Sequence, residues 1–296
     1  MSVKLNFGMI GIGNWGKNLI RDLSKYGYIE KCHSTGNQNN IRWVKNNYPS
    51  IKYVSDKNKI FNDDKINAVV ISAPIKTHYS LVKKALLAKK HVFVEKPLCT
   101  NVSDANELIK IAKKNNLLLF VGHIFIFNEI FKKLVQISKK ENIQFIYFQW
   151  TKFGTFDEDI FLNLLSHDIS IILKLFGKPK KIKLISSSGF ISKNDVVTLN
   201  LEFSQNKKCQ IYLNRHSHHT QKTISVLTNK NIYFWNDSKL YKYNKKSGNS
   251  QLIFKSKLTP LENECKEFIS ELEKTQKSQE YANLAKDVIQ VIRKLK

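Results

Sequence analysis

The stretch that decides the fold is MIGIGNWGKNLI, Met9–Ile20. Residues 11–16 carry the pattern glycine-x-glycine-x-x-glycine, directly after the apolar segment 5–10. That segment predicts a buried strand, and apolar residues at helical spacing in 17–25 predict a helix. In this context of strand, turn and helix the pattern indicates a dinucleotide-binding turn.

Each glycine of the turn has its own expected role. Gly11 permits a tight turn, Gly13 lets the backbone approach a pyrophosphate, and Gly16 lets helix and strand pack closely. The following helix would offer free N–H groups and the positive end of its dipole to the phosphates. We therefore expect the turn, including Asn14 and Trp15, to bind a dinucleotide. The alternative is a purely structural turn.

The first 121 residues alternate between strand and helix patterns. Strand candidates lie near 5–10, 28–33, 51–54, 67–72, 91–94 and 117–121, and helical patterns near 16–25, 38–47, 77–88 and 102–115. Such alternation is typical of a doubly wound α/β domain, in which helices cover both faces of a parallel sheet. We predict a dinucleotide-binding Rossmann domain over residues 1–121.

The pattern changes after residue 121. We expect helices at 126–139 and 159–176, a strand at 142–151, successive short strands from 180 to 255, and helices at 260–274 and 282–294. This predicts a substrate-binding α+β domain over 122–296 with a large, mostly antiparallel sheet. Because a large apolar sheet face rarely stays in water, we also expect a homodimer or homotetramer through that sheet.

Two strands of the first domain end in chemically distinctive residues. One ends at Ala73 and Pro74, and the next ends at Glu95 and Lys96. Ligands of open α/β sheets bind outside the carboxyl ends of the strands. We therefore expect these four residues to face the crevice that holds the glycine turn. His78, at the start of the next helix, either shapes the same crevice or caps the helix.

The net charge of +25 raises the possibility of a nucleic-acid partner. Arginine, however, is the residue that nucleic-acid-binding proteins concentrate. The arginines here are Arg21, Arg42, Arg215 and Arg293, and the lysines are spread along every segment. We expect no specific nucleic-acid partner, although a positive field could speed the association of an anionic substrate.

Cysteine usage and hydropathy predict the compartment. The four cysteines form no C-x-x-C pair, which favours free thiols in a reducing cytoplasm over a zinc site. No stretch is long and apolar enough to span a bilayer, and the chain enters its first strand almost at once. We expect a cytoplasmic protein without a signal peptide, a membrane partner or a metal.

The segment around residue 216 contains further polar candidates. His216, His218 and His219 lie in a polar stretch that we expect to be a solvated loop rather than a metal site. Arg215 and Lys222 could reach an anionic substrate, or form ion pairs at the surface.

Four more motifs follow the glycine turn: SAPIKTH (72–78), VEKPL (94–98), VGH (121–123) and LSHDISIILKLFG (165–177). With these motifs in this order, essentially the whole chain resembles the Gfo/Idh/MocA family of glucose–fructose oxidoreductases and inositol dehydrogenases. The opening and the SHDIS segment are similar to the branch that acts on nucleotide sugars, such as UDP-N-acetylglucosaminuronate 3-dehydrogenases.

The resemblance implies an NAD(P)-dependent enzyme that interconverts a secondary hydroxyl and a ketone on a sugar or nucleotide sugar by hydride transfer. Lys96 matches the family lysine that contacts the substrate hydroxyl and the nicotinamide ribose, and His167 matches the histidine proposed as acid or base. Asn163 stands where many members carry aspartate. Asp168 is a poor replacement, because neighbouring helical residues point about 100° apart.

Asn163 also supports an alternative. Asparagine cannot ionise, so it orients His167 by hydrogen bonding without stabilising its charged form. A non-catalytic, cofactor-binding regulatory protein of the same fold would tolerate that change.

Besides Asn163, the sequence differs from the usual pattern at the site expected to bind the cofactor. NAD sites usually have an acidic residue about 20 residues beyond the glycines, bonded to the ribose. Thr35 falls at that place, and no acid lies between Lys31 and Arg42. Ser34, Thr35 and Arg42 would instead accommodate a 2′-phosphate, which favours NADP over NAD. The alternative is NAD bound without the acid.

Overall fold

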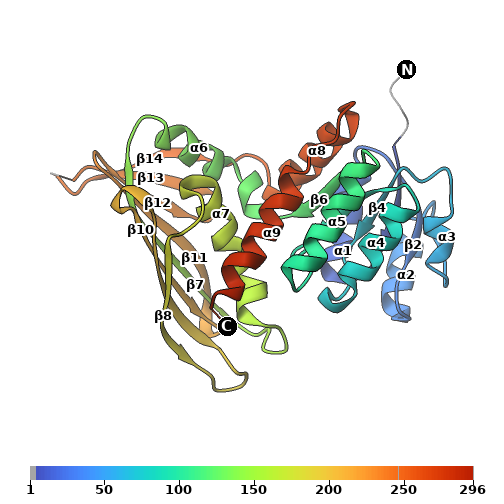
Figure 1. The fold of residues 1–296 in the computed structure, drawn as a ribbon, viewed down its shortest axis with the longest axis horizontal. Coiled ribbons are helices and arrows are strands. Elements are labelled where there is room, and N and C mark those ends of the chain that lie inside the picture. The colour runs from blue at the N-terminus through green and yellow to red at the C-terminus, as the bar shows by residue number, and fades with distance from the viewer. Residues whose placement is uncertain (1–4, 246, 296) are drawn as a thin grey trace. The chain divides into compact units, whose positions relative to one another are not determined.

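The computed structural model describes residues 5–245 and 247–295, which form two compact units. One unit holds the residues up to His123 and Leu261–Lys286, and the other holds Ile124–Pro260 and the residues from Asp287 onward (Figure 1). The first segment of the first unit thus ends at His123, and the division into a dinucleotide-binding and a substrate-binding domain stays a prediction. Helix α8 (Pro260–Glu273), which we expected in the second domain, packs within the first unit.

The first unit is built on a six-stranded sheet in the order β3-β2-β1-β4-β5-β6, in which every pairing is parallel. Its strands are β1 (Asn6–Ile10), β2 (Tyr28–His33), β3 (Lys52–Tyr53), β4 (Ala68–Ile71), β5 (His91–Glu95) and β6 (Leu119–Gly122). All four residues of β4 are buried, as expected for a central strand with both faces covered. The doubly wound α/β fold predicted from the sequence is confirmed.

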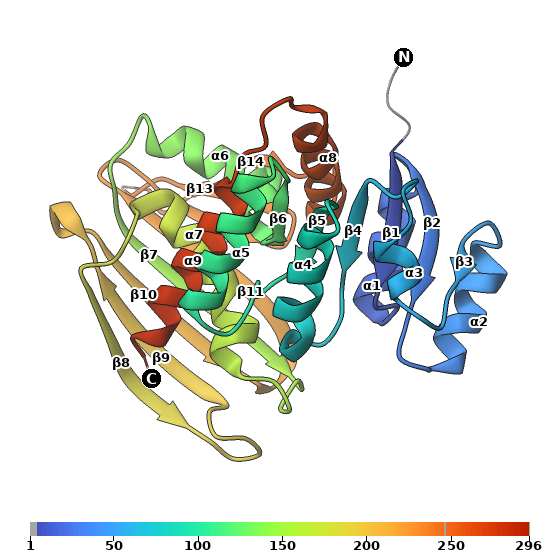
Figure 2. The same cartoon turned by 45° about the vertical axis from the view of Figure 1, so that its right-hand side comes forward.

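The helices of this unit follow the predicted alternation. They are α1 (Asn14–Leu23), α2 (Gln38–Asn47), α3 (Asn58–Phe61), α4 (His78–Leu87), α5 (Val102–Lys114), α8 and the first part of α9 (Glu280–Arg293), with a 3₁₀ turn at Ile75–Thr77. Figure 2 shows α4 and α5 side by side against the sheet. The sequence did not indicate α3, because four residues are too few to show a helical period.

Aromatic packing explains why α8 joins the first unit. Phe268 of α8 is fully buried, and its ring centroid lies 5.3 Å from that of Phe93 and 5.4 Å from that of Phe120. Phe93 and Phe120 belong to β5 and β6. The apolar side of α8 thus covers the sheet, although the helix follows the second unit in the chain.

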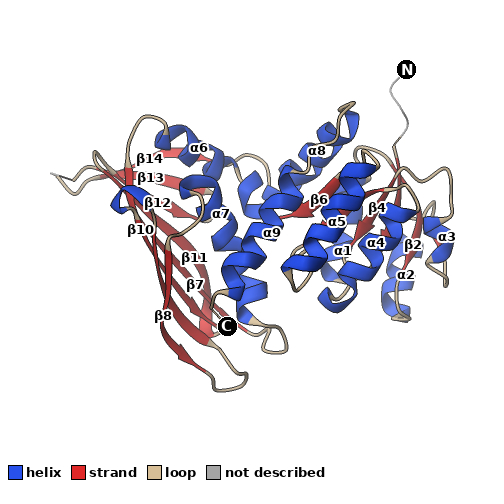
Figure 3. Cartoon of the chain, in the orientation of Figure 1, coloured by secondary structure: helices blue, strands red, loops and turns tan. Residues whose placement is uncertain are grey.

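The second unit is built on an eight-stranded sheet in the order β14-β13-β12-β11-β7-β10-β9-β8 (Figure 3). Its strands are β7 (Ile143–Phe153), β8 (Lys181–Ser188), β9 (Val196–Glu202), β10 (Lys208–Asn214), β11 (His216–Thr228), β12 (Ile232–Asn236), β13 (Lys239–Tyr243) and β14 (Ser250–Lys255). Within this sheet, over the described residues, only β7 and β10 pair in parallel. The mostly antiparallel sheet is confirmed.

Short helices accompany this sheet. They are the 3₁₀ turns Ile124–Phe127 and Ser204–Asn206, α6 (Glu129–Ser138), the π-helical turn Phe161–Leu165 and α7 (Ser166–Phe176). In Figure 3, α6 and α7 lie on one face of the sheet. No helix of the described second unit covers the other face in that view.

The histidine-rich segment is not the solvated loop that we expected. His216, His218 and His219 lie within β11, and the pairing of β11 with β7 is irregular between His216 and Gln221. A polar composition hid this strand end, because its side chains do not alternate between apolar and polar.

The expectation for Arg215 was also wrong, because its side chain is 1% exposed and neither reaches a ligand at the surface nor forms a surface pair. Its Nη2 lies 3.1 Å from Oδ1 of the fully buried Asp195. The backbone N–H groups of Phe190, Ile191 and Ser192 donate to Oδ2 of Asp195 at 2.8, 2.7 and 3.0 Å. The pair therefore fixes the turn between β8 and β9.

The environment of Asp195 also sets its ionisation. Burial alone would raise the pKa of Asp195, but hydrogen bonds from the Ser192 hydroxyl and the backbone N–H groups outweigh it. The pKa of Asp195 is therefore held well below its usual range. Such a carboxylate stabilises the fold above the pKa of the unfolded state, about 3.9, and loses that contribution as the pH falls.

We predict that Asp195→Asn lowers the free energy of unfolding at pH 7 by about 3 kcal/mol, because it leaves the guanidinium of Arg215 buried without its counter-ion. The difference in the free energy of unfolding between the variant and the wild type should become smaller as the pH falls below about 4. Urea titrations at pH 7 and pH 3.5 measure both. Asp157→Asn, at an exposed position, is the control and should change stability by less than about 0.5 kcal/mol. A loss below 1 kcal/mol at pH 7 contradicts this prediction.

Candidate functional site

The glycine turn after β1 is pressed against the end of β4. Gly11 has a φ of +97°, and a Cβ at this position would lie 2.1 Å from the backbone oxygen of Ser72. A Cβ at Gly16 would lie 2.2 Å from the backbone oxygen of Gly11. Only glycine fits these two positions, because each combines close backbone contact with no room for a side chain.

Gly13 has the opposite environment. A Cβ at Gly13 would meet no atom of the described residues within 4 Å, and its φ of −71° suits any residue. Gly13 is the N-cap of α1; no side chain of the described residues caps the helix, and no acidic residue lies in its first turn. Open space beside uncapped N–H groups fits the pyrophosphate of a dinucleotide.

The turn lies where the order of the sheet reverses. β1 pairs with β2 on one side and with β4 on the other, and the connections from the two strands lead to opposite sides. Gly11 packs against Ser72 and Ala73, so Ala73 and the exposed Pro74 lie beside the glycine turn as predicted. Contact of either residue with a cofactor stays a prediction.

A side-chain hydrogen bond joins the turn to the end of β5. The indole Nε1–H of Trp15 donates to Oε1 of Glu95. Burial raises the pKa of Glu95 to about 7, and the Trp15 hydrogen bond and the charge of Lys96 oppose this rise only in part. The structure therefore brings Trp15, Glu95 and Lys96 together at one edge of the sheet.

His78 links two of the loops at this edge. The ring is 1% exposed, with Nδ1 2.7 Å from the Pro97 oxygen and Nε2 2.8 Å from the Ala73 oxygen. Burial lowers the pKa of His78, so the neutral ring donates to one of the two carbonyls at a time. The His78 ring thus lies between the loops that follow β4 and β5 and contacts a carbonyl of each. Its contact with a cofactor stays a prediction.

The residues predicted for the 2′-phosphate follow the end of β2. Thr35 and Arg42 are exposed, and Ser34 is half-buried with its carbonyl accepting the Tyr53 hydroxyl at 3.2 Å. Asn37 caps α2 by accepting the N–H groups of residues 39 and 40. The loop thus presents hydroxyl and guanidinium groups without a carboxylate.

In the second unit, the helix expected at 159–176 is interrupted. Asn163 lies in the π-helical turn Phe161–Leu165, and His167 lies in the first turn of α7. The expected continuous α-helix is therefore replaced by a π-helical turn that leads into α7, with Asn163 in the first and His167 in the second. Such interruptions are frequent at functional sites.

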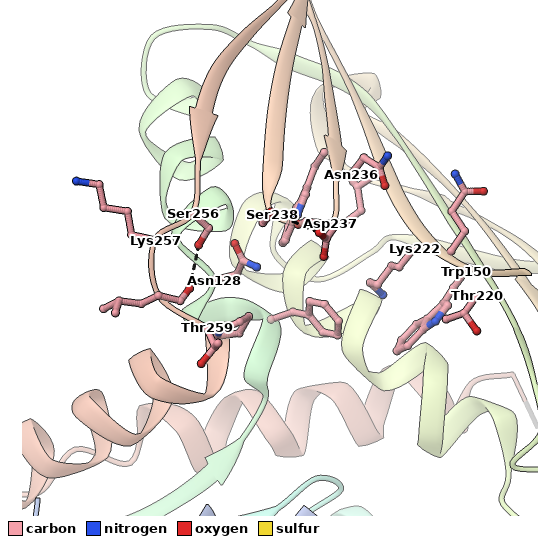
Figure 4. A pocket seen from close by; sticks show the side chains of 16 residues that line it. Asn128, Trp150, Thr220, Lys222, Asn236, Asp237, Ser238, Ser256, Lys257 and Thr259 are labelled. Carbon is pink, nitrogen blue, oxygen red and sulfur yellow. Dashed lines mark hydrogen bonds between the residues drawn. The ribbon is translucent and has the colours of Figure 1, made fainter. Parts of the chain in front are cut away.

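His167 packs within an aromatic cluster. Its ring centroid lies 5.1 Å from that of Phe125 and 5.5 Å from that of Trp150. The ammonium of Lys222 lies 3.7 Å from the Trp150 centroid and 4.4 Å from the Phe125 centroid (Figure 4). Nζ of Lys222 is also 2.5 Å from Oδ1 of Asp168. The carboxylate next to His167 in sequence thus pairs with Lys222.

Lys222 is therefore not the surface residue that we considered. Its side chain is 14% exposed, and Asp168 is fully buried. Burial lowers the pKa of Lys222 and raises that of Asp168, while the attraction between the two groups opposes both shifts. The aromatic rings add a cation–π contribution to the ammonium.

Lys222, Trp150 and Phe125 line a cavity of about 650 Å³ in the second unit. Its aromatic lining is Phe125, Trp150 and Trp235, and its polar lining includes Asn128, Lys222, Asn236, Asp237, Ser238, Ser256 and Thr259 (Figure 4). The volume lies in the range of small-molecule sites. Sequence reasoning missed most of these residues, because they come from five separate segments; the tryptophans in β7 and β12 were the available signal.

Within residues 5–245 and 247–295, no cluster of three or more histidine, cysteine, aspartate or glutamate side chains is arranged to hold a metal ion. No helix in these ranges is both long and apolar enough to cross a membrane. Cys32, Cys99, Cys209 and Cys265 are buried free thiols.

Comparison with known proteins identifies the first domain. Residues 5–123 match the Gfo/Idh/MocA model, an oxidoreductase family with an NAD-binding Rossmann fold. The N-terminal domain belongs to this oxidoreductase family. The glycine turn lies within the matched residues, and the open space at Gly13 fits the predicted pyrophosphate; binding of a dinucleotide there stays a prediction.

Two relatives of the chain are sugar-converting enzymes by name. The chain is 32% identical over 140 residues to myo-inositol 2-dehydrogenase of Thermotoga maritima, covering 47% of this chain and 42% of the relative. It is 23% identical over 206 residues to UDP-N-acetylglucosamine 3-dehydrogenase of Acidithiobacillus ferrooxidans, covering 66% and 62%. The match thus spans less than half of the length of the first relative.

The likeness of fold extends over nearly the whole chain. The solved structure of the Acidithiobacillus ferrooxidans UDP-N-acetylglucosamine 3-dehydrogenase superposes with a TM-score of 0.89, covering 99% of this chain and 96% of that chain at 16% identity. The chain therefore shares its two-sheet fold with that structure.

We predict that Gly13→Val weakens dinucleotide binding about 100-fold or more while leaving the free energy of unfolding nearly unchanged. The valine would fill open space that the pyrophosphate needs, without striking the protein. Calorimetric titration with NADPH and NADH measures the affinity, and urea unfolding measures the stability.

Gly16→Ala is the matched control, since its Cβ would strike the backbone of Gly11. It should destabilise the fold by about 1–3 kcal/mol. Unchanged affinity in Gly13→Val would show that this turn does not hold the pyrophosphate.

Proposed function

We propose that the chain is an NAD(P)-dependent oxidoreductase that interconverts a secondary hydroxyl and a ketone on a sugar or nucleotide sugar. The observation that carries the proposal is the family's dinucleotide turn, with open space at Gly13 and an uncapped helix N-terminus at the switch point of the sheet. The sugar-converting relatives support the substrate class.

The cavity of the second unit supports the same substrate class. The rings of Trp150, Trp235 and Phe125 offer flat apolar surfaces for the C–H faces of a sugar ring. Amide and hydroxyl groups such as those of Asn128 and Ser238 offer hydrogen bonds to sugar hydroxyls. Such a combination of aromatic lining and a few placed polar groups is typical of small-molecule sites.

The roles of the site residues follow from the chemistry of alcohol oxidation. A bound nicotinamide dinucleotide would accept or supply the hydride. His167 accepts the hydroxyl proton in oxidation and returns it in reduction, a task suited to an imidazole. Lys96 stabilises the negative charge that develops on the substrate oxygen. Asn163 orients by hydrogen bonding and carries no charge.

We predict that His167→Ala lowers turnover by about 10²–10⁴-fold, the usual contribution of general acid–base catalysis, with little change in dinucleotide affinity. The assay first screens sugars and nucleotide sugars with NADP and NAD to find a substrate. Asn163→Asp introduces an ionisable neighbour and should raise the pKa of the His167 imidazole, which moves the acidic limb of the pH–rate profile upward.

The controls distinguish an enzyme from a non-catalytic, cofactor-binding regulatory protein. His218→Ala, at an exposed position of β11, should keep full activity. Full activity in His167→Ala contradicts the assigned role. If no substrate turns over and Asn163→Asp creates activity, the regulatory alternative is the better description.

We further propose that the chain prefers NADP to NAD, because Ser34, Thr35 and Arg42 follow β2 where a ribose-binding acid would stand. Fluorescence titration should show tighter binding of NADPH than of NADH. Thr35→Asp should reverse this preference, since a carboxylate repels the 2′-phosphate. Thr35→Ser is the control that keeps the hydroxyl. Equal or tighter binding of NADH by the wild type contradicts the proposal.

We also propose a homodimer or homotetramer formed through the open face of the second sheet. Register places Tyr147, Ser225, Phe234 and Tyr241 opposite one another on neighbouring strands, so they share one face. All four are half-buried, and three of them are aromatic. A sheet face with this much aromatic surface is typical of an interface between protein chains.

A further inference from the structure

Glu264 of α8 is a buried carboxylate without an evident partner. Its side chain is fully buried, and neither carboxylate oxygen accepts a hydrogen bond within the described residues. No lysine or arginine in those ranges forms an ion pair with it. Because an isolated buried charge is very costly, the group needs either a proton or a donor.

Glu264 faces a second carboxylate over Gly122. Gly122 at the end of β6 pairs with Glu95 at the end of β5. A Cβ at Gly122 would lie 3.2 Å from Oε1 of Glu95 and 3.4 Å from Oε1 of Glu264. Two acceptor oxygens from β5 and α8 therefore converge on the space that the missing side chain leaves.

The surrounding groups do not neutralise Glu264. His123, after β6, is 1% exposed, and burial together with the charge of Lys96 lowers its pKa to about 3, so the ring is neutral. Burial and the charge of Glu264 raise the pKa of the Cys265 thiol on the same helix, so it stays protonated. Burial, and then the charge of Glu95, raise the pKa of Glu264 well above its usual range.

Two ionised carboxylates that share a buried site repel each other, and one proton between them removes the repulsion. Glu95 already accepts the indole N–H of Trp15 and lies beside Lys96, which favours its ionised form. Glu264 has neither contact, so the proton belongs on Glu264.

We propose that Glu264 is a protonated carboxylic acid that donates a hydrogen bond to Glu95 and thereby positions Glu95 as the acceptor for Trp15. The acid pair would fix the glycine turn against the strand end that carries Lys96. Glu264 is thus a positioning residue, and its effect on catalysis rests on the proposed function; its effect on Trp15 does not.

The indole N–H signal of Trp15 in the ¹H–¹⁵N spectrum of the free chain reports on this pair. Trp15→Phe identifies the signal among the four tryptophans. In the wild type, the signal should titrate with a midpoint near the pKa of Glu95, about 7. An indole signal that does not change between pH 5 and pH 9 overturns the proposal.

Two variants test the donor. Glu264→Leu removes the donor, so the ionised form of Glu95 loses a stabilising hydrogen bond. The midpoint of the Trp15 signal should then rise by about one pH unit. Glu264→Gln keeps an amide N–H that can donate, so the midpoint should stay within about 0.3 units of wild type. Glu262→Gln is the control on the same helix, where the carboxylate pairs with Lys25 at 2.9 Å, and the midpoint should not move.

The outcomes separate the two states of Glu264. A midpoint that falls by about one unit or more in Glu264→Gln would mean that Glu264 is ionised in the wild type, because the substitution then removes a repelling charge. An unchanged midpoint in Glu264→Leu would mean that no donor was lost. Either result overturns the proposal. If the midpoints move as expected but no sugar turns over, only the proposed function fails.

Discussion

The first domain depends on a contact in which no side chain fits. Gly11 meets the backbone of Ser72 so closely that a Cβ would lie 2.1 Å from its oxygen, and Gly16 approaches Gly11 in the same way. This close packing places the start of α1 at the switch point of the sheet. The outward-facing backbone of Gly13 and the free N–H groups of the helix then lie at the edge where β4 and β5 end.

The second unit is organised around a buried ion pair instead. Taking Lys222 and Asp168 out of water is costly, and the fold offsets part of that cost by stacking the ammonium on Trp150 and Phe125. The same two rings pack against His167. One arrangement thus holds the ammonium, the aromatic wall of the cavity and the candidate acid–base residue in fixed relation.

Much of the fold could be predicted, because its signals are local. The apolar strands, the glycine turn and the alternation of elements follow from sterics and periodicity within about twenty residues. The π-helical turn at Phe161–Leu165 was not predictable, since its composition is that of an α-helix. The strand that begins at His216 was missed because it lacks an alternating pattern. The burial of Arg215 was missed because arginine is rarely buried unless it is paired, and the sequence does not reveal its partner Asp195.

The sequence by itself determined the glycine turn, the alternation of strands and longer helices up to residue 121 and the family to which the first domain belongs. Those features arise from backbone sterics and from the hydrophobic period, which neighbouring residues set. Only the tertiary structure decided that Trp15 bonds Glu95, that α8 brings Glu264 over Gly122 and that Lys222 pairs with Asp168. These contacts join residues from distant segments, and their energies depend on burial, which exists only once the chain has folded.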